Sequence, residues 1–179
     1  MYNGGDVQKF VGKSPLPKII TGITNNFKYK NWDLNIFFNG NFGQYLYSNT
    51  ANAFFTAGTL ASGRNVTRDV VNSGESNLNA PDVSTRFLYN ASFLRLQNVT
   101  LGYNLKTKPN WLQALRVYVT GQNLFVITSY PGQDPEVNTS KPLGSLSAAG
   151  TNTGIPTVGI DYTSYPKTRT FTVGINATF

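Results

Sequence analysis

The fold is decided by the stretch Phe171-Thr172-Val173-Gly174-Ile175-Asn176-Ala177-Thr178-Phe179. Its odd-numbered residues are apolar, and its even-numbered residues are small or polar. Successive side chains of a β-strand point to opposite faces, so this strand needs an apolar environment on one side and a polar one on the other. A soluble β-sandwich and a membrane-spanning β-barrel both meet that need, and the rest of the sequence decides between them.

The composition is unusual for a soluble domain of 179 residues. Charged residues make up 13% of the chain, against about 25% in ordinary soluble domains, and aromatic residues also reach 13%. Asparagine, threonine, glycine and serine are abundant. A polar but uncharged surface is typical of strands whose wet face lines a lumen and whose apolar face meets lipid.

Several classes of function are disfavoured by what the sequence lacks. It has no cysteine and no histidine, which removes disulfides, thiol nucleophiles, imidazole bases and the usual zinc sites. Serine, lysine and the carboxylates form no recognisable catalytic motif, so we expect no enzyme, no metal and no cofactor. The net charge is +7, but the basic residues are scattered singly, so we do not expect nucleic-acid binding. No run of roughly 18 apolar residues predicts a transmembrane helix.

Strand patterns recur along the chain. Besides 171–179, alternation of apolar and polar residues predicts strands over residues 18–29, 32–42, 92–105 and 115–129. Each is long enough to cross a membrane at a tilt, for which ~9 to 11 residues suffice.

The connections between these strands are alternately short and long. Residues 30–31 and 106–114 make short links, whereas about 43–91 and 130–166 are long and rich in small polar residues. Loops of this length are uncommon in compact soluble domains. An up-and-down barrel with short turns on one side of the membrane and long loops on the other accepts them. We also expect a short helix within 66–73.

We therefore predict an all-β fold, an antiparallel up-and-down transmembrane β-barrel. Barrels need about eight strands or more, so we expect only the last five or so strands to be present here. Residues 1–16 are polar and glycine-rich and are interpreted as the remnant of an extracellular loop. Residues 17–179 are interpreted as the C-terminal part of the barrel.

Two stretches closely resemble the C-terminal signature of SusC/RagA-type TonB-dependent outer-membrane transporters of Bacteroidota. They are SFLRLQNVTLGYNL at 92–105 and LRVYVTGQNLF at 115–125. Other parts of the chain are similar to that family too: PLPK at 15–18, NGNFG at 39–43, PGQDPE at 131–136, YPKTRTF at 165–171 and the closing Phe179.

The resemblance implies a barrel of about 22 strands with an N-terminal plug, which the TonB complex drives through an N-terminal part absent from this sequence. It also implies location in the bacterial outer membrane, contact with outer-membrane lipid, and a SusD-like surface lipoprotein as partner. The family imports oligosaccharides, peptides or similar large nutrients. The final aromatic residue resembles the signal read by the outer-membrane assembly machinery.

Polar residues within the strands are candidates for lining the lumen. A charge on the lipid side costs about 2 to 4 kcal/mol at the midplane, so strand arginines are expected to face water. The candidates are Asn98, Thr100, Asn104, Arg116, Thr120, Gln122, Arg169, Thr172 and Asn176. Arg95 falls in the phase of Val99 and Leu101, so we expect it near the outer rim, close to the lipid headgroups.

Aromatic residues gather near the short turns and in the first long connection. Amphipathic rings prefer the headgroup level, so the first group is interpreted as membrane-interface anchors: Tyr29, Trp32, Tyr103, Trp111 and Phe179. The second group, in or near the first long connection, is either packed within that loop or available to contact a sugar: Tyr45, Tyr47, Phe54 and Phe55.

Asp134 and Glu136 flank Pro135 in the second long connection. They are candidates for contact with solute or partner, for acid–base work, or, with Asp161, for a calcium site. A rigid outer-loop turn fixed by Pro135 is the interpretation we favour.

The sequence is also compatible with two other functions. In one, several copies complete a small oligomerising outer-membrane pore or adhesin, which predicts a stable oligomer from this chain alone. In the other, the chain is a soluble all-β carbohydrate-binding module, in which the apolar faces pack together and the protein stays soluble without detergent.

Overall fold

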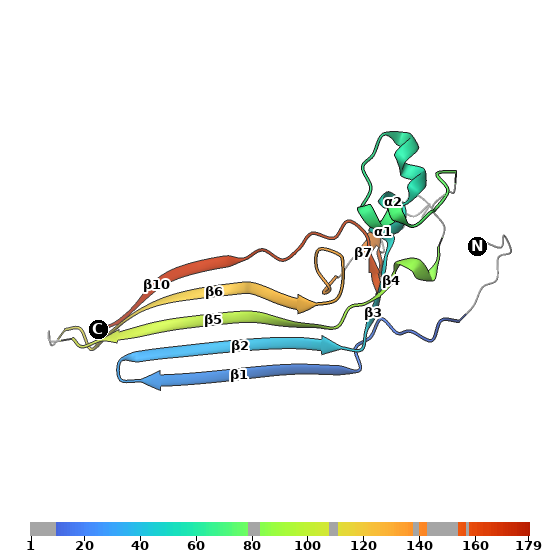
Figure 1. Cartoon of the computed structure of the whole chain (residues 1–179). Coiled ribbons are helices and arrows are strands. Elements are labelled where there is room, and N and C mark those ends of the chain that lie inside the picture. The colour runs from blue at the N-terminus through green and yellow to red at the C-terminus, as the bar shows by residue number, and fades with distance from the viewer. Residues whose placement is uncertain (1–9, 79–82, 108–110, 138–139, 143–153, 157) are drawn as a thin grey trace, which may run out of the picture.

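The computed structural model describes residues 10–78, 83–107, 111–137, 140–142, 154–156 and 158–179. Its main feature is one long antiparallel sheet with the strand order β1-β2-β5-β6-β10 (Figure 1). The strands are β1 (Ile19–Tyr29), β2 (Trp32–Phe42), β5 (Phe93–Leu105), β6 (Ala114–Thr128) and β10 (Thr170–Thr178). All five expected strands are therefore confirmed, with ends that differ by at most one residue from the prediction.

The two short connections and the C-terminus lie at one end of the sheet, and the long connections lie at the other (Figure 1). Tyr29 pairs with Trp32 directly across the first turn, where Lys30 adopts a left-handed φ of 53°. Neighbouring strands run antiparallel throughout. The expected up-and-down arrangement of the five strands is confirmed, and the sheet is not closed into a barrel.

The register places apolar and polar side chains in separate rows across all five strands. One row is Phe27, Leu34, Leu101, Val119 and Val173, each paired with the next. The neighbouring row, on the opposite face, is Asn26, Asn35, Thr100, Thr120 and Thr172. The alternation read in single strands thus extends over the whole sheet.

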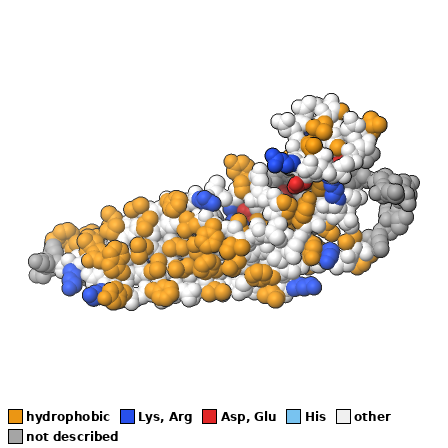
Figure 2. Space-filling view, viewed as in Figure 1, with side chains coloured by type: hydrophobic (Ala, Val, Ile, Leu, Met, Phe, Trp, Pro, Cys, Tyr) orange, Lys and Arg blue, Asp and Glu red, His pale blue; other side chains and the backbone are white. Residues whose placement is uncertain are grey.

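The apolar face of the sheet is open. Val173 is 75% exposed, Ile175 67% and Ile23 49%, and none of the described segments covers them. Figure 2 shows apolar side chains gathered over this face, with basic side chains mainly near its edges. An uncovered apolar surface of this extent is unusual for a soluble monomer and indicates that this face meets another apolar surface.

The long connections fold into a separate layer at their end of the sheet. Strand β3 (Tyr45–Ser48) pairs antiparallel with β4 (Leu88–Asn90) and parallel with β9 (Ile160–Asp161), so the two long connections share a small sheet. The helices here are α1 (Asn49–Phe54), η1 (Ala57–Ser62), α2 (Arg68–Asn72) and η2 (Thr85–Phe87), and β7 (Ser140–Pro142) pairs with β8 (Gly154–Pro156). The helix expected within 66–73 is confirmed as α2, whereas the short strands were not predicted.

The hydrophobic core lies among these connections. Leu46, Ala91 and Tyr130 form a buried cluster, and Tyr89 and Val137 pack against it. None of the described helices is long and apolar enough to cross a membrane.

Candidate functional site

The polar face of the sheet carries a charged network near the short turns. Arg116 on β6 donates from Nε to Asp33 Oδ1 at 3.0 Å and from Nη2 to Asp33 Oδ2 at 2.5 Å. Asn104 on β5 donates from Nδ2 to Asp33 Oδ1 at 3.0 Å. The bidentate pair therefore joins β6 to β2, and the Asn104 hydrogen bond joins β5 to the same carboxylate.

Two glycines make room for large side chains on this face. A Cβ atom at Gly102 would lie 2.6 Å from Asp33 Oδ2 and would also meet the guanidinium of Arg116. A Cβ atom at Gly174 would lie 2.5 Å from the hydroxyl oxygen of Tyr118. The side chains of Arg116 and Tyr118 therefore lie flat on the sheet. Any residue larger than glycine at position 102 or 174 would displace them.

The structure brings most of the lumen candidates together. The register aligns Asn98 with Gln122, Thr100 with Thr120, and Asn104 with Arg116 on one face, and the hydroxyls of Thr100 and Thr120 are 2.9 Å apart. Thr172 and Asn176 continue the same rows on β10, opposite Thr120 and Arg116. Arg169 is exposed in the segment just before β10. That this face lines a lumen stays a prediction.

Arg95 lies on the polar face, which corrects the prediction that it shares the face of Val99 and Leu101. The register of β5 shifts between Leu96 and Asn98, so the strand changes phase there. Arg95 is aligned with Asn39, is only 3% exposed, and donates from Nη2 to Asp134 Oδ1 at 2.5 Å.

Asp134 and Glu136 both engage basic residues within the chain. Asp134 is 5% exposed and also accepts from the backbone N–H of Glu136 at 2.9 Å. Glu136 Oε2 is 3.5 Å from Arg95 Nε and 2.6 Å from Lys167 Nζ. The turn through Pro135 is thus held to β5 on one side and to the segment before β10 on the other.

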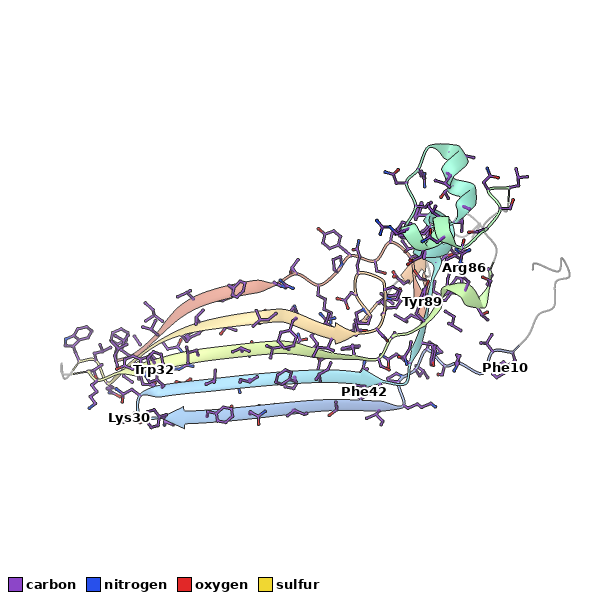
Figure 3. All side chains as sticks on the ribbon, viewed as in Figure 1. Phe10, Lys30, Trp32, Phe42, Arg86 and Tyr89 are labelled. Carbon is purple, nitrogen blue, oxygen red and sulfur yellow. The ribbon has the colours of Figure 1, made fainter. Side chains whose placement is uncertain are left out.

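The predicted interface aromatics gather at the end with the short turns. Trp32, labelled in Figure 3, packs on Tyr103 with ring centroids 4.7 Å apart, and Tyr29 is paired with Trp32 in the register. Trp111 stacks on Phe179 at 5.9 Å with an interplanar angle of 9°. Their interaction with a membrane interface stays a prediction.

A cavity of about 770 Å³ lies among the long connections, beside α1, α2 and η2. Phe54 and Phe55 line it, as do the segments at 131–133 and 163–165. The other two predicted loop aromatics lie elsewhere. Tyr45 accepts a hydrogen bond from Lys13 Nζ at 3.3 Å, and Tyr47 belongs to β3 and pairs with β4 and β9.

Arg86 and Asp161, two of the charged residues that line this cavity, are paired. Arg86 Nη1 is 2.7 Å from Glu75 Oε2. The hydroxyl of Tyr130, which is buried beside the cavity, donates to Asp161 Oδ2 at 2.5 Å. Burial, and then this hydrogen bond to a carboxylate, raise the pKa of Tyr130.

Sequence reasoning missed several residues of the cavity, including Phe87, Tyr89, Gln133 and Tyr165. They come from segments without a regular period, so alternation gave no sign of them. The single available sign was compositional, namely aromatic residues within otherwise small and polar connections.

The sheet has an open apolar face and a polar face backed by glycines. Its short turns lie at one end and its long connections at the other. These features define one wall of an antiparallel β-barrel of the outer-membrane type.

No family model matches the chain. It is 37% identical over 186 residues to TonB-dependent receptor P3 of Formosa agariphila, covering 96% of this chain and 17% of that protein. It is 33% identical over 181 residues to TonB-dependent receptor SusC of Bacteroides thetaiotaomicron, covering 96% of this chain and 16% of that protein.

The solved structures agree. The chain superposes on the RagAB peptide importer with a TM-score of 0.76 in both the "open-open" and the "closed-closed" state, at 26% identity, over 100% of this chain and 19% of that one. The chain belongs to the SusC/RagA-type TonB-dependent receptors. The resemblance read from the sequence is confirmed, and the chain spans about a sixth of the length of its curated relatives.

Proposed function

We propose that this chain is the C-terminal part of an outer-membrane TonB-dependent importer of large nutrients, either glycans or peptides. The observation that carries the proposal is the sheet itself, which is apolar over one face and polar over the other across all five strands. A wall between lipid and an aqueous path needs this division. The similarity to TonB-dependent receptors supports the same reading.

In this proposal each part of the molecule has a place in the bacterial outer membrane. The apolar face contacts lipid, and the aromatics at the short turns anchor the periplasmic interface. The polar face lines the path of the solute. The connections at about 43–91 and 130–166 lie outside the cell, where they meet a SusD-like lipoprotein. TonB acts through a part of the receptor outside this sequence, and no covalent chemistry is involved.

A chimera tests the proposal. The segment of the RagAB importer that matches this chain is replaced by residues 15–179, and the product is expressed in cells lacking the native importer. We expect the chimera to reach the outer membrane, to resist surface protease as the native barrel does, and to import a fluorescent peptide only when TonB is present. A chimera that assembles but imports nothing, beside an active native importer, contradicts the proposal.

A further inference from the structure

The cavity among the long connections has the size and chemistry of a ligand site. At about 770 Å³ it falls within the range of ordinary small-molecule pockets. Resting on the proposed function, we infer that it holds an uncharged sugar residue of the imported glycan. The inference depends on three properties of its lining: free aromatic surface, unpaired neutral polar groups, and no unpaired cation among the described lining residues.

Free aromatic surface comes from two residues of different connections. Phe55, just after α1, is 37% exposed, and Tyr165, just before β10, is 87% exposed. Phe54 beside them is held in place by two contacts. Its ring stacks on Tyr162 with ring centroids 6.5 Å apart, and the Arg64 guanidinium lies over the ring, 5.2 Å from its centroid. The C–H groups on one face of a pyranose ring pack against such aromatic faces, much as apolar groups do.

Neutral polar groups lie beside these rings. The Ser164 hydroxyl is shielded from solvent and has no hydrogen-bond partner among the described residues. The Gln133 amide also lines the cavity, and no described residue hydrogen-bonds to it. A shielded hydroxyl without a partner is unfavourable, and a hydroxyl of the ligand would supply the missing hydrogen bond. An amide and a hydroxyl offer both donors and acceptors, as the hydroxyls of a sugar require.

The charges at the cavity point to a neutral ligand. Arg86 is paired with Glu75, and Asp161 accepts from Tyr130, so neither is free to pair with a charged group. Asp69 is the lining carboxylate for which no partner lies among the described residues, and it disfavours an anionic ligand. The lining therefore discriminates against uronate and sulfated sugars and against acidic peptides.

One wall of the cavity is fixed before any ligand binds. Residues 131–133 form that wall, and the next residue, Asp134, is anchored to Arg95 in the buried ion pair. Tyr130, on the other side of the wall, is anchored to Asp161. A wall held at both ends loses little freedom on binding, which favours affinity.

Binding by the full-length receptor that contains this chain tests the inference. The detergent-purified protein is applied to an array of neutral, uronate-bearing and sulfated glycans together with acidic and neutral peptides. Phe55→Ala and Tyr165→Ala are compared with Phe10→Ala, which removes a 94% exposed ring that does not line the cavity (Figure 3). We expect binding to neutral glycans that each cavity variant weakens at least about fivefold and that Phe10→Ala leaves unchanged.

The other outcomes separate this inference from the proposed function. Import of glycans with unaltered binding in both cavity variants overturns the site and leaves the function standing. Preference for anionic glycans, for peptides, or for no member of the array overturns the ligand class. A receptor that is folded in the outer membrane but imports neither glycans nor peptides overturns the function itself. Gln133→Ala, which leaves every ring in place, checks that any loss is not a folding defect of the aromatic variants.

Discussion

Arg95 and Asp134 form an ion pair at 2.5 Å in which both side chains are almost fully buried, 4% and 5% exposed. Arg95 belongs to β5, and Asp134 belongs to the connection after β6. The pair fastens that connection onto the polar face of the sheet. Its existence depends on the phase change in β5, without which Arg95 would point to the other face.

Breaking this pair should destabilise the protein more than breaking an exposed one. Arg95→Met leaves the Asp134 carboxylate buried without its partner, and we expect a loss of about 3 kcal/mol in urea unfolding of the detergent-solubilised receptor. Arg86→Met is the control, because the Arg86 side chain is 36% exposed, and it should cost less than about 1 kcal/mol. The double variant Arg95→Met with Asp134→Leu should recover most of the loss, and failure to do so would count against an electrostatic origin.

Gly102→Ala should disturb the network of Asp33 and Arg116. The added Cβ would overlap the guanidinium and the carboxylate, so we expect a loss of about 1 to 3 kcal/mol. Gly22→Ala is a matched control on the same face, where the added Cβ would meet Phe37 at 3.4 Å, an ordinary contact. It should be neutral or slightly stabilising. The unfolding temperature of each variant is measured from its heat-dependent gel mobility. Equal unfolding temperatures for the two variants would contradict the packing argument.

Adjacent residues on β10 test which face meets lipid. Val173→Arg places a cation on the apolar face and should cost about 2 to 4 kcal/mol, with reduced assembly into the membrane. Thr172→Arg places the same cation on the polar face and should be tolerated. Assembly is measured as the fraction of receptor that is protease-resistant in isolated outer membranes. Equal assembly of the two variants would argue that the apolar face does not contact lipid.

Stability should fall at alkaline pH through Tyr130. Burial and the hydrogen bond to Asp161 raise the pKa of Tyr130 in the folded protein, so above the unfolded value of about 10 the unfolded chain loses a proton that the folded chain keeps. The contribution is complete below pH 10 and is lost as the pH rises through the folded pKa. Unfolding at pH 9 to 11.5 should show a steeper decline for the native protein than for Tyr130→Phe. Tyr165→Phe, whose ring is largely exposed, should follow the native curve.

The long strands were predictable because each carries its own two-residue period. Hydrophobic alternation located the two hairpins and the last strand, and the family resemblance placed them in a barrel. The phase change in β5 was less easily read, although its trace is present as the two consecutive polar residues Gln97 and Asn98. If the two-residue period is continued through β5 without that interruption, Arg95 is assigned to the wrong face.

The cavity was beyond sequence reasoning for a different reason. Its walls come from connections that meet through the parallel pairing of Tyr47 with Ile160, across most of the chain. Pairing between such short and distant strands leaves no local period. The candidates Phe54 and Phe55 were identified by composition, whereas Tyr165 and Gln133 were brought to them by tertiary structure.

The alternation of short and long connections also predicts the order in which the strands pair during folding. Joining two strands across a tight turn takes microseconds, whereas closing a long connection costs more chain entropy and is slower. The hairpins β1–β2 and β5–β6 should therefore gain hydrogen-exchange protection first, and the ladders β2–β5 and β6–β10 should gain it later. The wall should thus assemble from two preformed hairpins, to which β10 is added as a single strand.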